Sequence, residues 1–421
     1  MPRINPFKPT SPAPTGMFAG RVDEIIELEK ALFQTKNNQP MNFMITGDRG
    51  IGKSSLLLFL KHVSCGEIQS IKHGSFDFIT VNIAVSDRLD VTTLIKLAER
   101  NISRELNKIE TVRSFMVETW AFVQRLKIMD SGISEAEKDS EVELQVDDFA
   151  YSLAETCKRL INPERGEKRK DGILFLFDEC DNATTELRLG YFFKTVTEAL
   201  QRHDCNNIMF IIAGLPETPE KLAKSHESSV RIFSHMKVSE LQVNDRNFVI
   251  DKGIGEANKI NNEKTTITTE AKYHISTLSE GYPHFIQQFA YSAFDHNTDG
   301  EISVDDVLDA AFKSGGAIDA IGSRYYKSAF YDKIKSDEYR QVLSIMAEKM
   351  NAWITKAEIR ASFTGDESTL SNALQALTTR KIILKNPAKI GEYRLQQRGF
   401  ALWIKLFGDR KKINNPSNTS Q

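Results

Sequence analysis

Met-Asn-Phe-Met-Ile-Thr-Gly-Asp-Arg-Gly-Ile-Gly-Lys-Ser-Ser, residues 41–55, is the stretch that decides the fold of this chain. Residues 41–46 are mostly apolar and predict a buried strand, and the apolar run after Ser55 predicts a buried helix. Between them, residues 47–54 fit the pattern Gly-x-x-x-x-Gly-Lys-Ser, which binds phosphate when it joins a strand to a helix. The pattern and its context together predict a loop that binds a nucleoside triphosphate.

The glycines of this loop and its place before a helix explain why it would bind phosphate. Gly47, Gly50 and Gly52 permit a tight turn in which successive backbone N–H groups point at one anion. The start of the following helix adds unpaired N–H groups and the positive end of the helix dipole. We expect Lys53 to reach the β- and γ-phosphates and Ser54 to ligate Mg²⁺. The predicted nucleotide contacts in the loop are Gly47, Asp48, Arg49, Gly50, Ile51, Gly52, Lys53, Ser54 and Ser55.

A second apolar run, residues 173–177, ends in Asp178 and Glu179. Such a strand delivers one carboxylate to Mg²⁺ and a second to the place where water attacks the phosphate. We therefore expect Asp178 to hold the metal through water and Glu179 to polarise the attacking water as the catalytic base. Alone, the pair could cap a strand. Together with the phosphate-binding loop, it indicates a site of nucleotide hydrolysis, in which Lys53 also acts.

The remaining pattern up to residue 240 predicts an α/β fold of the P-loop NTPase type. Further strands are expected at 76–84 and 207–214, and helices at 91–128 and 149–161. The acidic, polar stretch 130–148 predicts an exposed insertion. Strands that alternate with helices form a parallel sheet with the ligand at the carboxyl edge of its strands. Past residue 240 the pattern is helical, which predicts a helical lid.

Composition and charge narrow the classes of function. The chain has 421 residues, 40% of them hydrophobic, enough for several domains with their own cores. Its net charge of −2 excludes a general attraction to nucleic acid or anionic membrane, so any such affinity must come from a local patch. Four cysteines without a Cys-x-x-Cys pair indicate reduced thiols rather than disulfides or zinc. With no apolar run near ~18 residues and no signal-peptide pattern, we expect a cytoplasmic protein without a membrane partner.

Residues 295–306 allow two interpretations. Asp306 stands at the twelfth position of a possible calcium loop, where a glutamate is expected. The other positions that fit the loop are Asp295, Asn297, Asp299, Gly300, Glu301 and Ser303. The alternative is a turn between two lid helices, in which Ser303 and Asp306 form a capping box. The shorter Asp306 side chain favours the turn, and calcium binding stays the alternative.

The C-terminal region predicts a winged helix-turn-helix. Helices are expected at 337–350, from Thr355 and at 367–380, and strands at 382–385 and 392–395. Residues 337–412 carry 14 Lys and Arg against 8 Asp and Glu, a local excess of positive charge that suits DNA. A winged helix can also dock protein. The predicted DNA contacts are Ser371, Asn372, Gln375, Arg380, Lys381, Lys385 and Lys389.

Taken together, these motifs resemble the prokaryotic AAA+ ATPases of the origin-recognition and replication-initiator-like group, over roughly residues 18–407. The segments that carry the resemblance are Phe18-Ala-Gly-Arg21, Gly47 to Ser54, Ile173 to Glu179, Gly281-Tyr-Pro-His284, and Tyr393-Arg-Leu with Ala401-Leu-Trp403. The resemblance implies an ATPase core at 18–240, a helical lid at 241–328 and a winged-helix domain at 329–412. A Pro-rich arm at 1–17 and a flexible tail at 413–421 would flank them.

The resemblance also implies ligands and partners. These are ATP and Mg²⁺, a homo-oligomer or AAA+ assembly whose subunits share ATP sites, double-stranded DNA and an unidentified effector protein. Phe18 and Arg21 would lie near the adenine, and Pro283 and His284 would contact the nucleotide from the lid. Arg231 falls where related proteins present an arginine finger to the next subunit, although an ordinary surface arginine is the alternative.

The chain also departs from that family pattern. Ala213-Gly214 stands where a polar sensor is usual, and His284 stands where an arginine is usual, so hydrolysis is expected to be slow. The Gly-x-Pro of the lid is also similar to STAND-type signalling ATPases. Two functions are therefore predicted. The first is an ATPase that assembles on DNA and controls a partner through its nucleotide state. The second is a nucleotide switch in a signalling or defence complex, whose winged helix binds protein.

Overall fold

The computed structural model describes residues 3–12, 18–70, 72–106, 110–126, 135–334, 336–350, 352–380, 382–386 and 388–408. Lys381 and the predicted tail at 413–421 lie outside the described residues. The chain forms two compact units, one of residues 12–239 and one that combines residues 1–11 with 240–421. The predicted boundary between lid and winged helix, at 328/329, stays a prediction.

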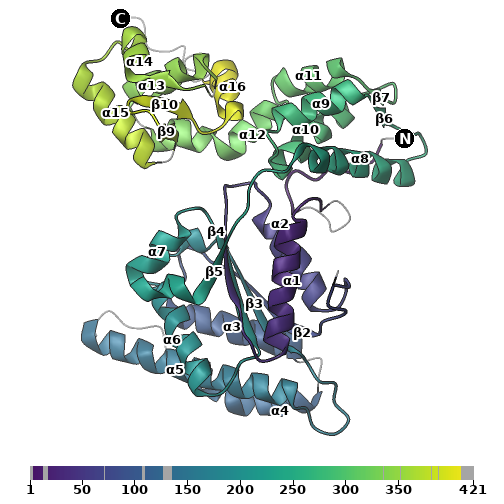
Figure 1. The fold of residues 1–421 in the computed structure, drawn as a ribbon, viewed down its shortest axis with the longest axis vertical. Helices are drawn as coiled ribbons and strands as arrows, with labels where there is room; N and C mark the ends of the chain where they lie inside the picture. Colours follow the sequence, from purple (N-terminus) through teal and green to yellow (C-terminus); the bar gives the residue numbers. More distant parts are fainter. Residues whose placement is uncertain are drawn as a thin grey trace, which may run out of the picture. The chain divides into compact units, whose positions relative to one another are not determined.

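A five-stranded sheet forms the centre of the unit 12–239 (Figure 1). Its strands, in spatial order, are β2 (Phe78–Ala84), β3 (Gly172–Asp178), β4 (Ile208–Gly214), β1 (Asn42–Thr46) and β5 (Phe233–Lys237). All neighbours pair in parallel, which confirms the predicted sheet. β5 was not expected, because its exposed Ser234 and His235 interrupt any apolar run.

Helices cover both faces of this sheet. α1 (Val22–Lys36) and α2 (Lys53–Ser64) pack on one face, and α3 (Val91–Leu106), α5 (Glu135–Ile161) and α6 (Leu189–Arg202) pack on the other (Figure 1). The shorter elements are α4 (Glu110–Thr119), η2 (Ala121–Arg125), η3 (Cys180–Asn182), α7 (Thr218–Ser225) and η4 (Glu227–Ile232). Because both faces are covered, β1, β3 and β4 are almost continuously buried.

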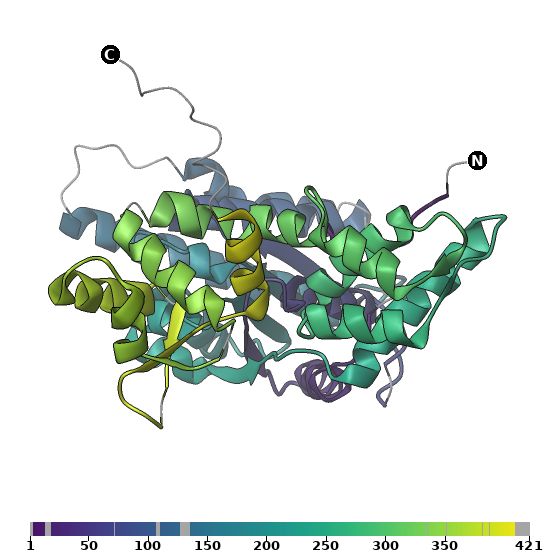
Figure 2. The same cartoon turned by 90° about the horizontal axis from the view of Figure 1, so that it is seen from above.

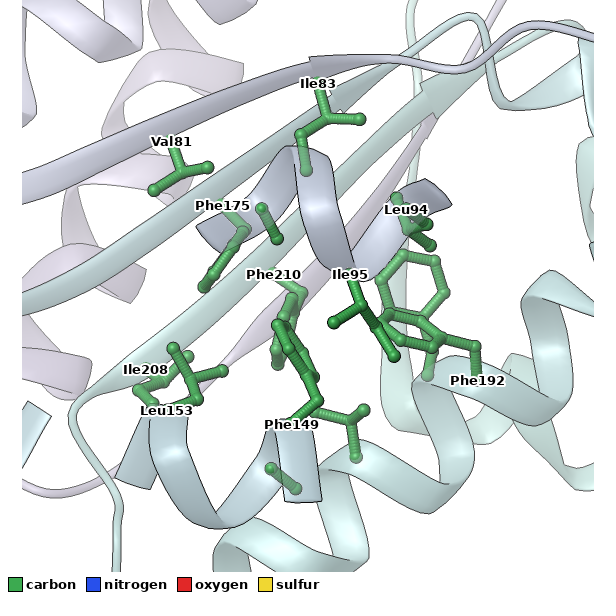
Figure 3. Packing of buried hydrophobic residues seen from close by; sticks show 14 of the residues in the cluster. Val81, Ile83, Leu94, Ile95, Phe149, Leu153, Phe175, Phe192, Ile208 and Phe210 are labelled. Atoms are coloured by element: carbon green, nitrogen blue, oxygen red, sulfur yellow. The ribbon is translucent and has the colours of Figure 1, made fainter. Parts of the chain in front are cut away.

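Aromatic side chains fill the layer between the sheet and α5 and α6. Phe175 of β3 stacks on Phe210 of β4, with ring centroids 5.2 Å apart. Figure 3 shows both rings on the side of the sheet that faces Phe149 of α5 and Phe192 of α6. Aromatic pairs of this kind add to the area that each ring buries, so the layer fixes the strand ends that carry the predicted site.

The prediction of an exposed insertion at 130–148 is wrong for residues 135–148, which belong to α5. Val146 and Phe149 lie fully buried against the core, while acidic side chains occupy the outer face. Residues 135–148 contain four helix-forming glutamates, and their apolar residues recur at helical spacing. The polar character of this stretch therefore comes from the outer face of α5. Residues 130–134 lie outside the described residues.

The other unit begins with a helical lid. Its elements are α8 (Val243–Ile260), β6 (Thr266–Ile267), α9 (Thr269–Leu278), α10 (Pro283–His296), β7 (Glu301–Ile302), α11 (Val304–Phe312) and α12 (Ala317–Tyr325). Among the residues that the structure describes, no helix is long and apolar enough to cross a bilayer.

The same unit ends in the predicted winged helix. Its elements are η5 (Ser328–Lys333), α13 (Asp337–Glu348), β8 (Ile354–Thr355), α14 (Lys356–Ser362), α15 (Glu367–Thr379), β9 (Ile383–Lys385), β10 (Glu392–Leu395) and α16 (Arg398–Phe407). β10 pairs antiparallel with both β9 and β8. α16 packs against α12 and α13, and Figure 2 shows it, in yellow, between the helices of the lid and those of the winged helix. Gly322 permits this contact, because a Cβ there would lie 1.8 Å from Trp403.

Residues 295–306 form the predicted turn. The hydroxyl of Ser303 accepts from the backbone of Asp306, whose carboxylate accepts from the backbone of Ser303, so the capping box is confirmed. The side-chain amide of Asn297 donates to Asp299 (2.7 Å), to the carbonyl of Glu301 (3.0 Å) and to Asp306 (3.3 Å). An N–H donor thus takes up the oxygens that a calcium ion would need. The described residues contain no cluster of three or more acidic, His or Cys side chains suited to a metal ion.

Candidate nucleotide-binding site

The loop between β1 and α2 has the backbone that its glycines predict. Gly50 (φ 80°) and Gly52 (φ 103°) adopt left-handed conformations, which side chains disfavour. Gly47 is required for a different reason, because a Cβ there would lie 2.7 Å from the carbonyl oxygen of Val238, next to β5. The loop is therefore held between β1, α2 and the end of β5.

Lys53, the first residue of α2, points back over the loop. Its ammonium donates to the carbonyl oxygens of Gly47 (2.7 Å) and Asp48 (3.0 Å). Burial lowers the pKa of Lys53, and the nearby charges of Asp181, Asp178 and Asp48 act against that decrease. The side chain is thus a half-buried cation surrounded by oxygen atoms.

Ser54 and Asp178 meet although they are far apart in the sequence. The hydroxyl of Ser54 donates to Asp178 Oδ2 at 2.5 Å, and Asp178 Oδ1 accepts from the backbone N–H of Glu179 at 2.8 Å. A hydroxyl beside a carboxylate is the hard-oxygen set that suits Mg²⁺. The side chains present therefore fit the predicted metal.

Glu179 lies exposed just beyond the end of β3, in a left-handed conformation (φ 57°). Such a backbone costs about 1–3 kcal/mol for a residue other than glycine. Its carboxylate accepts from the amide of Asn182 at 3.3 Å, and that amide also donates to the carbonyl oxygen of Val85 at 3.3 Å, after β2. Asn182 thus ties Glu179 to two strand ends. Sequence analysis missed it, since no motif marks the third residue after the glutamate.

Asp181 is a further residue that sequence analysis missed, although it is the third carboxylate within four residues. Its Oδ1 accepts from the backbone N–H of Leu215 at 3.1 Å, and its carbonyl oxygen accepts from Lys221 of α7. A Cβ on Gly214 would lie 2.2 Å from the hydroxyl of Thr218 and 3.2 Å from Asp181 Oδ1. The end of β4 therefore has no room for the usual sensor side chain, and Asp181 is the polar group there.

Phe18 and Arg21 lie beside the phosphate-binding loop. The ring of Phe18 stacks on Phe59 of α2, with centroids 5.1 Å apart. The guanidinium of Arg21 donates to the carbonyl oxygen of Ile51 at 3.1 Å and pairs with Glu24 at 3.5 Å. The structure thus brings this N-terminal box together with the loop.

Arg231 lies exposed on η4, immediately before β5. Within the part of the chain that the structure describes, no hydrogen bond or ion pair joins it to the phosphate-binding loop. Its predicted role as an arginine finger in the ATP site of a neighbouring subunit stays a prediction.

His284 and Pro283 begin α10, in the other unit. Burial, with a smaller contribution from the charge of Arg324, lowers the pKa of His284 from 6.5 to about 4. His284 is therefore neutral at pH 7 and cannot replace the charge of an arginine. Arg324 of α12 supplies a positive charge beside it, with Nη1 3.4 Å from His284 Nε2. Nothing in the sequence pattern pairs these two residues.

The predicted DNA contacts form a less unified surface. On α15 and at Arg380, its C-cap, an open hollow of about 370 Å³ is lined by Asn372, Gln375, Ala376, Thr379 and Arg380. Ser371 faces α14 instead, since its hydroxyl donates to the carbonyl of Glu367 and accepts from Lys356. On the wing, Lys385 is exposed, and Lys389 pairs with Glu392 at 3.5 Å.

No protein-family model matches the chain, and no curated protein matches it. Its similarity to solved structures covers nearly the whole chain. The ORC2 protein of Aeropyrum pernix is 13% identical with a TM-score of 0.54, over 97% of this chain and 98% of that chain. The chain is also similar to the Cdc6p of Pyrobaculum aerophilum, with 13% identity and a TM-score of 0.41 over 96% of this chain and 98% of that chain. It is similar as well to the ORC1 protein of Aeropyrum pernix, with 12% identity and a TM-score of 0.44 over 94% of each chain.

This chain has the ORC-type AAA+ fold. The match to the ORC2 protein carries that conclusion, because it covers 97% of this chain, from the sheet through the lid to the winged helix. The predicted resemblance and fold class are confirmed. At 13% identity, the likeness extends to the fold and leaves the roles of individual residues to the geometry described above.

Proposed function

We propose that this ORC-type chain is a Mg²⁺-dependent ATPase that assembles on double-stranded DNA and controls a partner protein through its nucleotide state. The observation that carries the proposal is the 2.5 Å contact between Ser54 and Asp178 beside Lys53. It joins the two nucleotide motifs at one edge of a parallel sheet, where such folds bind ligands. The similar ORC2 protein was solved in complexes with ADPNP and ADP, which supports a nucleotide here.

Each residue of the site has a role in this mechanism. The backbone N–H groups of residues 47–54 bind the phosphates, and Lys53 exchanges its loop carbonyls for the β- and γ-phosphate oxygens. Ser54 and Asp178 would hold Mg²⁺, which would supply positive charge to balance the charge that develops on the phosphates. Glu179 accepts a proton from the attacking water, in an orientation held by Asn182. Phe18 and Arg21 flank the nucleotide base.

DNA binding is supported by the charge and shape of the winged helix. Asn372, Gln375 and Arg380 project from the exposed face of α15, as a helix that enters the major groove requires. Lys385 and Lys389 extend the positive surface onto the wing. Assembly follows if Arg231 reaches the ATP site of the next subunit.

The test measures ATP turnover and particle mass, each with and without duplex DNA. We expect turnover that DNA stimulates and a particle that grows with ATP. Lys53→Ala should abolish nucleotide binding, while Lys30→Ala on the exposed face of α1 serves as the matched control. Arg231→Ala should lower turnover only under conditions in which the protein assembles.

Two outcomes would redirect the proposal. A chain that binds no nucleotide would refute it. A nucleotide-bound monomer indifferent to DNA would favour the nucleotide switch, whose winged helix binds protein. Turnover that persists in Arg231→Ala under assembling conditions would remove Arg231 from the mechanism.

A further inference from the structure

Residues 3–9, here called the N-terminal strap, lie on the lid, although the chain from residue 12 onward belongs to the other unit. Phe7 is the main anchor. Its side chain is 2% exposed and meets Phe294 of α10 edge-on, with centroids 6.5 Å apart. On α8, a Cβ at Gly253 would lie 2.1 Å from the Phe7 ring, so a glycine is required there. Gly253 and Phe294 thus form a seat for one aromatic side chain.

Arg3 is the second anchor and binds the end of α10. Its guanidinium donates to the carbonyl oxygens of Phe294 (2.9 Å) and Asn297 and to Asn297 Oδ1 (3.1 Å). It also lies 4.8 Å from the centroid of the Phe294 ring. A cation at the C-terminus of a helix satisfies unpaired carbonyls and the negative end of the dipole.

Lid side chains also bind the backbone of the strap, as a protein binds an extended peptide. Asn261 accepts from the N–H of Ile4 (2.7 Å) and donates to its carbonyl (2.9 Å). Gln287 accepts from the N–H of Lys8 at 2.9 Å, and Arg324 donates to the carbonyl of Pro9 at 3.3 Å. These contacts select an extended segment with an arginine four residues before a phenylalanine.

The chain crosses between its two units twice, at residues 11/12 and at residues 239/240. The crossing at residues 11/12 is short, because the step from Ser11 to Phe18 can span at most roughly 25 Å. We propose that the lid surface formed by α8, α10 and α12 is a peptide-binding site whose occupant is this chain's own strap. The bound strap then acts as a second tether that limits rotation of the lid. A body held at two points turns about the axis between them, whereas a body held at one point turns freely.

The test measures the distance distribution between a spin label on each unit by double electron–electron resonance. Labels at Lys30→Cys and Tyr273→Cys use exposed positions, in a Cys65→Ser background. Phe7→Ala empties the seat from the strap side, and Gly253→Leu fills it from the lid side. Both should broaden the distribution relative to the unsubstituted strap. Phe312→Ala, at a lid phenylalanine 39% exposed, is the matched control and should leave it unchanged. Unchanged widths in both variants would overturn the proposal.

A peptide of residues 1–11 separates tethering from packing. Phe7→Ala should lower the melting temperature by roughly 5–15 °C. Added peptide should restore it in Phe7→Ala but not in Gly253→Leu, whose seat is filled. The distance distribution should stay broad in both, because the peptide is not joined to the other unit. Failure to restore the melting temperature of Phe7→Ala would refute the peptide site. A distance distribution that becomes narrower when free peptide is added would refute the tether. Neither result depends on ATP or DNA, so the proposed function is tested separately.

Discussion

The predicted functional residues converge on one site in the nucleotide-binding unit but not in the lid and winged helix. In the nucleotide-binding unit, Ser54 and Asp178, 124 positions apart, meet at 2.5 Å, and Lys53 lies over the same loop. In the lid and winged helix, several of the predicted polar residues are instead bound to neighbours in the same unit. His284 is neutral beside Arg324, and Asp306 caps a helix.

The difference teaches where a motif predicts a site. Parallel strands place all their carboxyl ends at one edge, so residues that end β1 and β3 converge whatever their spacing in the sequence. Helix surfaces impose no such convergence. A polar residue there binds the nearest complementary group, as Ser371 binds Lys356. The predictions below test this contrast, beginning with the largest effect.

The sharpest test within the nucleotide-binding unit is Glu179→Gln. Removing the general base should reduce ATP turnover by about 10²–10⁴-fold while ATP affinity stays unchanged, because the amide keeps the shape but accepts no proton. Steady-state hydrolysis and nucleotide titration measure the two quantities. Glu220→Gln, exposed on α7, is the control. Persistent turnover in Glu179→Gln would mean that another group activates the water.

In the lid, the neutral state of His284 should appear as a pH dependence of stability. Its folded pKa, about 4, lies below the unfolded value of 6.5, so the unfolded state takes up the proton first. Above pH 6.5 His284 is neutral in both states and does not lower the free energy of unfolding. That free energy falls as the pH decreases from 6.5 toward 4. At pH 4.5 the wild type should lose about 2–3 kcal/mol relative to His284→Gln, a comparison in which other groups cancel.

Urea denaturation at pH 7.0, 5.5 and 4.5 measures that difference, with His274→Gln on α9 as the control. Parallel pH profiles for the wild type and His284→Gln would contradict a neutral, buried His284. They would also remove one half of the contrast between the two units.

On the winged helix, each exposed cation is expected to contribute about one phosphate contact to DNA binding. The double variant Arg380→Ala/Lys385→Ala should bind duplex DNA about tenfold more weakly, with a salt slope reduced by up to about 2, since each phosphate contact contributes about 0.9. Fluorescence anisotropy over a salt series measures both. Lys327→Ala, exposed outside the winged helix, is the control. Unchanged affinity would point to protein as the partner of this surface.

The smallest effect concerns the turn at 295–306. Asp306→Ala should cost about 1 kcal/mol, because it removes a capping-box partner. Asp305→Ala, in the same first turn but outside the capping box, separates capping from the helix dipole. The melting temperature of the wild type should be the same in calcium and in EDTA. An increase with calcium would show that the Asn297 amide yields its oxygens to the ion.

Much of the fold could be predicted because the burial of a strand or helix determines the spacing of its apolar residues in the sequence. The continuous apolar runs of β1, β3 and β4 identify strands covered on both faces. The same rule failed for β5, which is short and partly exposed, and for α5, whose polar face was mistaken for an insertion. Asn182 and Asp181 were missed because their roles depend on how η3 folds back over the ends of β2 and β4.

The sequence by itself determined the phosphate-binding loop, the carboxylates after β3, the strands of the parallel sheet and the elements of the winged helix, because each depends on residues close together in the chain. Only the tertiary structure decided that Arg324 lies beside His284, that Asp181 fills the end of β4, and that Arg3 and Phe7 bind the lid. The residues joined by these contacts lie between 34 and 294 positions apart in the sequence. Local propensity and periodicity do not predict such pairs, since they form only when the helices and strands pack against one another.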